Sequence, residues 1–390
     1  MTSCLGDDEV VLSSDVALLS FGIKDLKTTY TIKKQDGTDS TYTTVMAGNA
    51  VRFTIDQASR KVYNSDSIAY RTDVKKVLVN VKADGGVVYV KADGAVGSVE
   101  DSIDFTCPVT FIVTSYDKKF TRSYEVSINV HQVDPKKTTW KEVGETDFPV
   151  LGAQKAFVKD DSLCVIGVDA DGAYYHVATA LNDGVTWTTT PCIGLEGTGV
   201  DALLEDGVFY LKNSEGLYCS ENAIEWTAVD EAEVLNLPEA VDMSHAVALF
   251  RQPLSTNESI VRSIFVSTPE TVSTWARVWT KLSTEPEWIE IGESGNNVYG
   301  CPNLENLSVI QYAGNMYAFG LKSMGESKEL SSCYESRDNG ITWKVNESAL
   351  SLPKDLKVPA EEFSTATDGE YVWVMWSNGA VWRGRWNGIN

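Results

Sequence analysis

The chain has 390 residues, with 33 basic and 55 acidic side chains and a formal net charge of −22. A surface this acidic repels phosphate backbones, which excludes general nucleic-acid binding and disfavours adhesion to anionic lipid through a basic patch. Hydrophobic residues make up 43% of the chain, as in folded proteins, and no run of 18 apolar residues predicts a membrane-spanning helix.

The composition changes near residue 134. Residues 1–134 carry 15 basic and 18 acidic side chains, whereas residues 135–390 carry 18 and 37 and contain all 11 tryptophans. Residues 133–137 form a short polar stretch with a proline, which suits a linker. We therefore expect a flexible start over 1–12, one domain over 13–134 and a second over 135–390.

Cys4 follows a serine and precedes the acidic stretch Asp7-Asp8-Glu9. This arrangement resembles the processing and export site of Bacteroidetes surface lipoproteins. The resemblance implies a lipid on Cys4, a location at the cell surface on the outer membrane, and membrane contact through that anchor alone. No basic or apolar segment precedes Cys4, so the sequence contains no signal peptide. The alternative is that Met1 is a true start and residues 1–12 are a flexible acidic terminus.

The first domain has the alternating pattern of half-buried strands. Tyr124, Val126, Ile128 and Val130 alternate with polar residues, and residues 111–114 precede them across a short hairpin-like connection. Asp-Gly pairs favour tight turns, and we expect a hairpin at residues 84–85 and a further turn at 93–94. Short strands without an amphipathic helix predict an immunoglobulin-like β-sandwich.

A repeated turn motif marks the second domain. Residues 336–343 match the pattern Ser-x-Asp-x-Gly-x-Thr-Trp in full, residues 180–187 match it with two changes, and residues 220–226 are a shortened copy. The motif resembles the Asp box, a tight hairpin found in sialidases, other glycosidases and further β-propellers. The residues expected to build these turns are Asn182, Gly184, Trp187, Asn222, Trp226, Asp338, Gly340 and Trp343.

Strand-like runs between these motifs divide the second domain into four-stranded blades. We predict an all-β propeller of five blades, or of six because the third blade is long enough to hide another. The last blade lacks an outer strand, and residues 138–143 are placed to supply it. That pairing would join the two ends of the ring and remove a free sheet edge.

The sequence offers no recognisable reaction centre, so we predict no catalytic residue. A sialidase would need an arginine triad, which the few arginines of this region do not suggest. The histidines are isolated, and no CxxC or metal-binding motif is present, so neither a metal nor a cofactor is expected. A sugar favours aromatic rings together with amides and carboxylates. The loop residues that offer these groups are Asp169, Asp171, Tyr299 and Asn303.

Taken together, the acidic start, the immunoglobulin-like domain and the Asp-box propeller resemble two-domain surface lipoproteins of gut Bacteroidetes. The resemblance implies a non-catalytic, monomeric surface lipoprotein that binds glycans or partner proteins through propeller loops. Two alternatives stay open: a glycoside hydrolase or lyase that uses loop carboxylates, and a structural subunit of an outer-membrane assembly.

Overall fold

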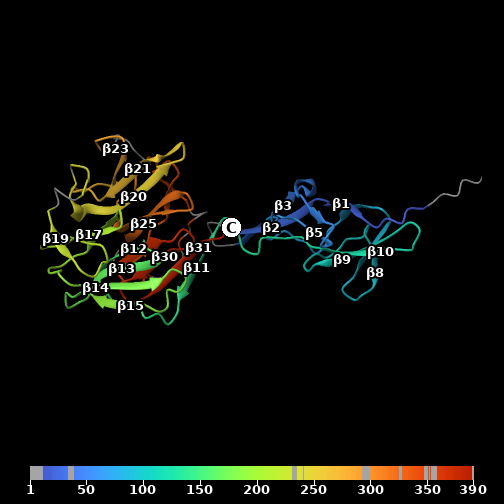
Figure 1. The fold of residues 1–390 in the computed structure, drawn as a ribbon, viewed down its shortest axis with the longest axis horizontal. Helices are drawn as coiled ribbons and strands as arrows, with labels where there is room; N and C mark the ends of the chain where they lie inside the picture. Colours follow the sequence, from blue (N-terminus) through green and yellow to red (C-terminus); the bar gives the residue numbers. More distant parts are fainter. Residues whose placement is uncertain are drawn as a thin grey trace, which may run out of the picture. The chain divides into compact units, whose positions relative to one another are not determined.

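The computed structural model describes residues 12–33, 39–230, 235–239, 241–291, 299–324, 327–346, 350, 352 and 358–388. The chain divides into two compact units, residues 1–135 and 136–390 (Figure 1). Both units are built from β-strands, which confirms the predicted all-β class. No helix among the described residues has the length and apolar character needed to cross a membrane.

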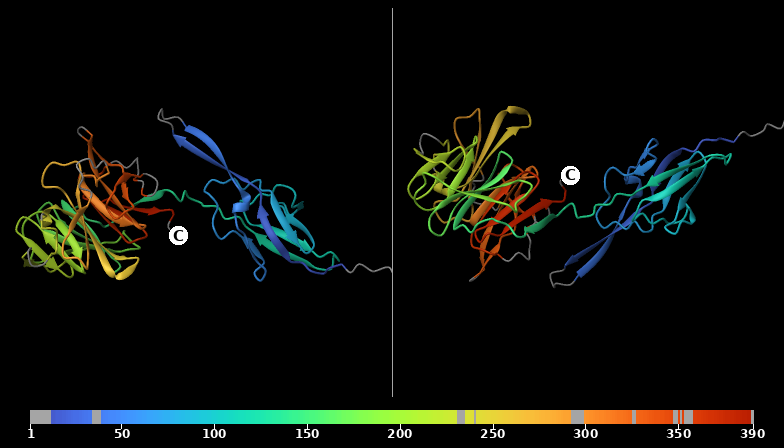
Figure 2. Two further views of the ribbon diagram at one scale, coloured as in Figure 1. Left: turned by 90° about the horizontal axis from the view of Figure 1, so that it is seen from above. Right: turned by 60° about the horizontal axis from the view of Figure 1, so that its bottom comes forward.

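The first unit contains three sheets among its described residues. One pairs β1 with β6, one has the order β4-β5-β10-β9-β7-β8, and one is the hairpin β2–β3, which projects from the rest of the unit in Figure 2. The strands are β1 (Leu18–Ile23), β2 (Leu26–Lys33), β3 (Asp39–Met46), β4 (Thr54–Asp56), β5 (Lys61–Tyr63), β6 (Val79–Ala83), β7 (Gly86–Val90), β8 (Val96–Ser98), β9 (Val109–Thr114) and β10 (Thr121–Val126), and the helix η1 spans Gly48–Ala50.

The core of the first unit follows the predicted alternation. Tyr124, Val126 and Ile128 are buried, and Phe111 faces Tyr124 across the β9–β10 pair. The turn expected at residues 93–94 joins β7 to β8. The hairpin expected at residues 84–85 is wrong: β6 pairs with β1, while β7 pairs with β8 and β9. This turn carries the chain from one sheet to another, because turn chemistry fixes a local bend but not the strand that will be the partner.

The second unit contains five antiparallel sheets among its described residues, each with four strands in one repeated order, plus the short β26 beside β25. The strands are β11 (Thr138–Val143), β12 (Ala153–Lys159), β13 (Ser162–Val168), β14 (Tyr174–Ala180), β15 (Thr188–Pro191), β16 (Asp201–Glu205), β17 (Val208–Lys212), β18 (Leu217–Ser220), β19 (Thr227–Val229), β20 (Ala246–Leu254), β21 (Asn257–Ser267), β22 (Arg277–Leu282), β23 (Ile289–Ile291), β24 (Glu305–Tyr312), β25 (Asn315–Met324), β26 (Ser327–Leu330), β27 (Tyr334–Ser336), β28 (Lys344–Val345), β29 (Phe363–Thr367), β30 (Val372–Trp376) and β31 (Val381–Trp386), with the helix η2 over Met243–His245.

These sheets form a closed ring. The inner strands β12, β16, β20, β24 and β29 contact one another in that order, and β29 returns to β12. Five buried apolar clusters lie in the ring, and each combines residues from two neighbouring sheets. Burial of apolar side chains between successive sheets is what holds such a ring together. This arrangement is a β-propeller, as the sequence predicts.

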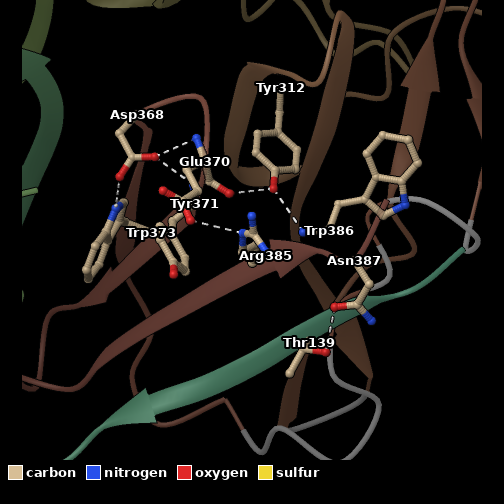
Figure 3. Close-up of polar contacts among 9 residues, drawn as sticks. All are labelled: Thr139, Tyr312, Asp368, Glu370, Tyr371, Trp373, Arg385, Trp386 and Asn387. Atoms are coloured by element: carbon tan, nitrogen blue, oxygen red, sulfur yellow. Dashed lines mark hydrogen bonds and ion pairs between the residues drawn. The ribbon is translucent and has the colours of Figure 1, made fainter. Parts of the chain in front are cut away.

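The ring closes through the first strand of the unit. β11 pairs with β31 from Thr138 opposite Trp386 to Val143 opposite Val381, as predicted for residues 138–143. Beyond the strand ends, the Thr139 hydroxyl donates to Asn387 over 2.9 Å (Figure 3). The final blade therefore combines strands from both ends of the second unit.

Polar contacts tie this closing blade to its neighbour and order its hairpin (Figure 3). The Tyr312 hydroxyl on β24 donates to the Glu370 carbonyl over 2.8 Å and accepts from the Trp386 amide over 2.9 Å. Asp368 accepts from the Glu370 and Tyr371 amides and, over 3.0 Å, from the Trp373 indole. These bonds satisfy backbone groups where the β29–β30 turn meets the next sheet.

The three repeated turns share one set of contacts. In each, the tryptophan indole donates to a turn carbonyl: Trp187 to Gly184 over 2.9 Å, Trp226 to Ala223 over 3.1 Å, and Trp343 to Gly340 over 3.0 Å. All three rings are buried against a neighbouring sheet. The turns therefore fix each outgoing strand to the ring.

The side chain that accepts the backbone amides varies between the turns. Asp338 accepts from the Thr342 amide over 2.8 Å, and Asn222 accepts from two amides over 2.9 Å. In the turn at residues 180–187 the acceptor is Asp183, not the predicted Asn182. The Asp183 carboxylate, one position after Asn182, accepts the turn amides of Val185 and Thr186. Alignment to the motif alone did not reveal this shift of the acceptor.

Candidate functional site

A cavity of about 360 Å³ runs along the axis of the ring. It is lined by residues of all five inner strands, β12, β16, β20, β24 and β29. Because the sheets repeat one strand order, these strands start at the same end of the ring, which we call the channel mouth. Residues at the first positions of the inner strands, and those just before them, therefore gather there although they lie far apart in the sequence.

One group of charged side chains lies at the start of β16. Asp201 is the first residue of this strand, and burial raises the pKa of its carboxyl, while the charge of Lys155 on β12 acts in the opposite direction. Burial also lowers the pKa of the Lys155 ammonium. Asp242 and His245, from the segment before β20, also act on Asp201 electrostatically. A carboxyl in this position keeps its proton to a higher pH than an exposed aspartic acid does.

The segment before β20 is held in place by a helix cap. Asp242 accepts from the Ser244 amide over 2.7 Å and also from the Ser244 hydroxyl, which lowers the pKa of Asp242. His245 Nδ1 lies 3.3 Å from Thr268 Oγ1, and the Thr268 amide donates to the His245 carbonyl over 2.9 Å. Asp242 is therefore an anchored carboxylate whose pKa is lowered, whereas that of Asp201 is raised.

A second group lies where β24 and β29 begin. Lys328 pairs with Glu305 over 2.5 Å and with Glu361 over 3.8 Å. Glu362 directly precedes β29, and its carbonyl accepts from the Ser377 amide over 3.0 Å. Glu362 is solvent-exposed; partial desolvation and the negative charge of Glu361 raise its pKa, and the charge of Lys328 acts in the opposite direction.

The two groups lie on different sides of the channel mouth. β16 and β29 are not neighbours in the ring, because β12 separates them on one side and β20 and β24 on the other. Asp201 and Glu362 therefore lie at the starts of the two inner strands on either side of β12, at the end of the ring where these strands begin, and the pKa values of both carboxyls are raised. Paired carboxyls with raised pKa values are suited to proton transfer near neutral pH.

At the second positions of β12 and β29, two buried polar atoms lack partners. Gln154 donates through Nε2 to the Met375 carbonyl over 2.6 Å, yet among the described residues nothing bonds to its Oε1. The Ser364 hydroxyl also has no partner in that part of the chain. Gln154 and Ser364 are 7% and 5% exposed and both line the cavity. Unpaired buried polar groups are costly, so these atoms call for water or a ligand.

The four loop residues predicted to bind a sugar are not brought together as a site. Asp169 accepts from the Asp171 and Ala173 amides over 3.0 and 2.9 Å, which makes it a turn residue of the β13–β14 hairpin. Asn303 donates to the Ser273 carbonyl over 2.9 Å and precedes β24. These two positions belong to different, non-neighbouring sheets of the ring.

Tyr299, the fourth, is 48% exposed. Its carbonyl accepts from the Trp343 amide over 2.7 Å, and the Lys344 ammonium lies 5.1 Å from its ring centre. Both of these contacts come from residues at or next to the end of the turn at residues 336–343. Cys4 lies outside the described residues. Within those residues, no three His, Cys, Asp or Glu side chains are grouped so as to hold a metal ion.

Sequence reasoning missed Lys155, Asp201 and Glu362. One signal could have indicated them: when the predicted blades are aligned, acidic residues recur where inner strands begin, at Asp201, at Glu305 and, one position earlier, at Glu362. A search for motifs could not find them, because the ring and not the local sequence brings them together.

The sequence model of the DUF6242 beta propeller domain matches residues 134–247 and 244–390, and that of the DUF6242 N-terminal domain matches residues 21–128. The chain belongs to the DUF6242 family. A search of curated proteins finds no relative of this DUF6242 chain.

Solved structures with a similar fold include three that differ widely in sequence. A DUF4623 family protein from Bacteroides eggerthii is 12% identical, with 95% of this chain and 98% of that chain covered and a TM-score of 0.35. The catalytic domain of a GH62 α-L-arabinofuranosidase from Coprinopsis cinerea is 9% identical, with 65% and 98% covered and a TM-score of 0.40. An α-L-arabinofuranosidase, CtGH43, from Clostridium thermocellum is 12% identical, with 57% and 81% covered and a TM-score of 0.38.

These comparisons correct the predicted function. The prediction of a non-catalytic surface lipoprotein rested on the lack of a catalytic motif, and it is not kept, because the structural neighbours include glycoside hydrolases. At these identities the likeness describes the fold alone. The physical reason for the error is that the absence of a local motif does not exclude a site whose residues come from separate blades.

Proposed function

We propose that this DUF6242 protein is a glycoside hydrolase whose reacting carboxyls are Asp201 and Glu362. The observation that carries the proposal is the placement of these two carboxyls, both with raised pKa values, at the mouth of a cavity between non-neighbouring inner strands. Glycoside hydrolysis commonly uses two carboxyl groups that flank the scissile bond.

The roles follow from the surroundings of each group. Protonated Asp201 donates its proton to the glycosidic oxygen as the bond from that oxygen to the anomeric carbon breaks. Glu362, from the other side of the mouth, takes a proton from a water whose oxygen bonds to the anomeric carbon. This use of a water directly at the anomeric carbon is the mechanism of an inverting hydrolase. Asp201 ends ionised and Glu362 protonated, and exchange with solvent restores both.

Hydrolysis of a panel of aryl glycosides tests the proposal. The panel contains arabinofuranosides, xylosides, hexosides and hexuronides, and the variants are Asp201→Asn and Glu362→Gln. Each substitution is expected to lower kcat by about 10²–10⁴, the usual contribution of one acid or base. Glu142→Gln, an exposed carboxylate of β11, is the matched control and keeps the wild-type rate. If no glycoside is cleaved, or if both variants cleave at the wild-type rate, the proposal fails.

We also propose that the propeller has five blades and that the first unit is an immunoglobulin-like spacer. The five four-stranded sheets and the buried, strand-built core of the first unit support this view. We further propose a monomer that is held at the outer membrane by a lipid on Cys4. When expressed behind a lipoprotein signal peptide in a bacterium, the native sequence is expected in the membrane fraction and Cys4→Ser in the soluble fraction. If the native sequence and Cys4→Ser are distributed equally between the two fractions, the proposed lipid anchor on Cys4 is wrong.

A further inference from the structure

The interior of the channel differs in charge from the rest of the molecule. The whole chain has a formal net charge of −22. Among the described residues that line the cavity, Lys155 is the one charged side chain, and no carboxylate lines it. The nearest opposite charge is Asp201, at the start of the neighbouring inner strand. The cavity wall is therefore suited to an anion, in a protein whose outer surface repels anions.

Within the described part of the chain, Lys155 makes no hydrogen bond or close ion pair, and the charge that acts on its ammonium is that of Asp201, which raises its pKa against the effect of burial. Lys159, on the same strand, contrasts with it, since its ammonium donates to the carbonyls of Gly207 and Glu221. Lys155 is half-buried at the cavity wall, and an anion in the cavity would add to the compensation that Asp201 gives its ammonium.

The unpaired polar atoms restrict the ligand further. Gln154 Oε1 can only accept a hydrogen bond, so its partner must carry an O–H or N–H group. The Ser364 hydroxyl can donate or accept. A simple carboxylate such as acetate supplies no donor, whereas a hydroxylated acid supplies both the anion and the donors.

The size of the cavity and its single cation restrict the charge. A volume of about 360 Å³ is at the lower end of the ~300–1,000 Å³ of small-molecule sites, so it suits a small ligand and not a polymer chain. One lysine compensates one negative charge, and a phosphate dianion would leave a second charge buried without a partner. A monoanionic sugar acid meets all of these conditions.

We propose that the channel is a subsite for one hexuronate residue, with its carboxylate on the Lys155 ammonium and its hydroxyls on Gln154 Oε1 and Ser364 Oγ. This inference rests on the proposed function and names its substrate class: glycans that end in a uronic acid. The terminal residue enters the channel, and its glycosidic bond stays at the mouth beside Asp201 and Glu362. The protein then removes single terminal residues and does not cut within a chain.

Calorimetric titration of the wild-type chain tests the subsite without any mutation. The probes are D-glucuronate, D-galacturonate, D-glucuronamide, D-glucose and acetate at one ionic strength. At least one uronate is expected to bind at least tenfold more tightly than D-glucuronamide, which has the same shape without the charge, and than acetate, which has the charge without the hydroxyls. Equal binding of acid and amide, or no uronate binding, overturns the proposal.

Substitutions then place the ligand. Lys155→Met is expected to lower uronate affinity at least tenfold while any glucose binding stays unchanged. Lys141→Met removes an exposed charge of β11 and serves as the control for net charge. Ser364→Ala is expected to lower uronate affinity by a smaller factor. If Lys155→Met binds uronate like the wild type, the carboxylate does not lie on Lys155 and the proposal is wrong.

The two proposals fail separately. Hydrolysis of neutral glycosides with no uronate binding would remove the subsite and leave the hydrolase. Uronate binding that Lys155→Met weakens, with no hydrolysis of any glycoside of the panel, would support the subsite and remove the hydrolase.

Discussion

Replacement of Gly184 by alanine tests whether the ring is held by close contact between successive blades. Gly184 lies in the turn at residues 180–187 with a φ of 72°, and a Cβ atom there would lie 2.5 Å from the Trp373 ring of the adjoining sheet. The backbone conformation costs an alanine about 1–2 kcal/mol. Forcing a methyl group into a packed interior costs about 1–3 kcal/mol more, since Trp373 is fully buried and cannot move aside. We expect a total loss of about 2–5 kcal/mol.

Gly172 supplies the matched control. It has a φ of 85° in an exposed turn, and a Cβ atom there would meet nothing within 4 Å. Gly172→Ala therefore carries the backbone cost alone, about 1–2 kcal/mol. The difference between the two variants isolates the contact between blades, because the backbone cost is common to both.

Denaturant unfolding followed by tryptophan fluorescence is the suitable assay. All 11 tryptophans lie in the second unit, so the signal reports on the propeller and not on the first unit. The free energy of unfolding is taken from the transition midpoint and slope. Equal losses for Gly184→Ala and Gly172→Ala would show that the blade contact is not tight at this turn, and would refute the reasoning.

Three further substitutions have defined outcomes. Tyr312→Phe leaves the Glu370 carbonyl and the Trp386 amide without their partner, and we expect a loss of about 1–3 kcal/mol in the same unfolding assay; an unchanged midpoint would contradict this. Ser364→Ala removes a buried hydroxyl without a partner, so the ligand-free protein is expected to unfold at the same or a higher denaturant concentration, and a clear loss would show a hidden partner. Glu362→Gln is expected to raise the thermal midpoint at neutral pH, because the folded pKa lies above the usual 4.5 and the folded protein disfavours the ionised form. Below pH 4.5 the Glu362 carboxyl is protonated in both the folded and the unfolded protein, so the stability gain of Glu362→Gln disappears. A gain that grows towards low pH would contradict the raised pKa of Glu362.

Local chemistry made much of the propeller predictable. The turns at residues 180–187, 220–226 and 336–343 each contain their acceptor, their bend and their tryptophan within eight positions, so a short pattern is enough to find them. The closing strand was predictable for a different reason, since a last blade that is one strand short requires a partner and residues 138–143 were available.

The candidate site was not predictable from the sequence. Asp201 and Glu362 lie far apart along the chain, and only the closed ring brings their strands to the same end of the channel. With 37 acidic residues in the second domain, no sequence pattern distinguishes this pair from others. The hairpin expected at residues 84–85 failed for a related reason: a turn signal states where the chain bends, while strand pairing depends on distant residues. The composition of the loops also did not indicate a binding site, because the Asp169 carboxylate accepts a backbone amide of its own turn.

The strand that closes the ring has a mechanical consequence. β11 begins three residues after the first unit ends at Pro135, and it is held in its sheet by β31 alone. Tension applied to the chain between the two units therefore loads β11 before any other strand of the propeller. Its removal would break the circle at one blade and expose the edge of β31, so a protein tethered from its N-terminal side would open first at its seam, while the four other sheets keep all their strands.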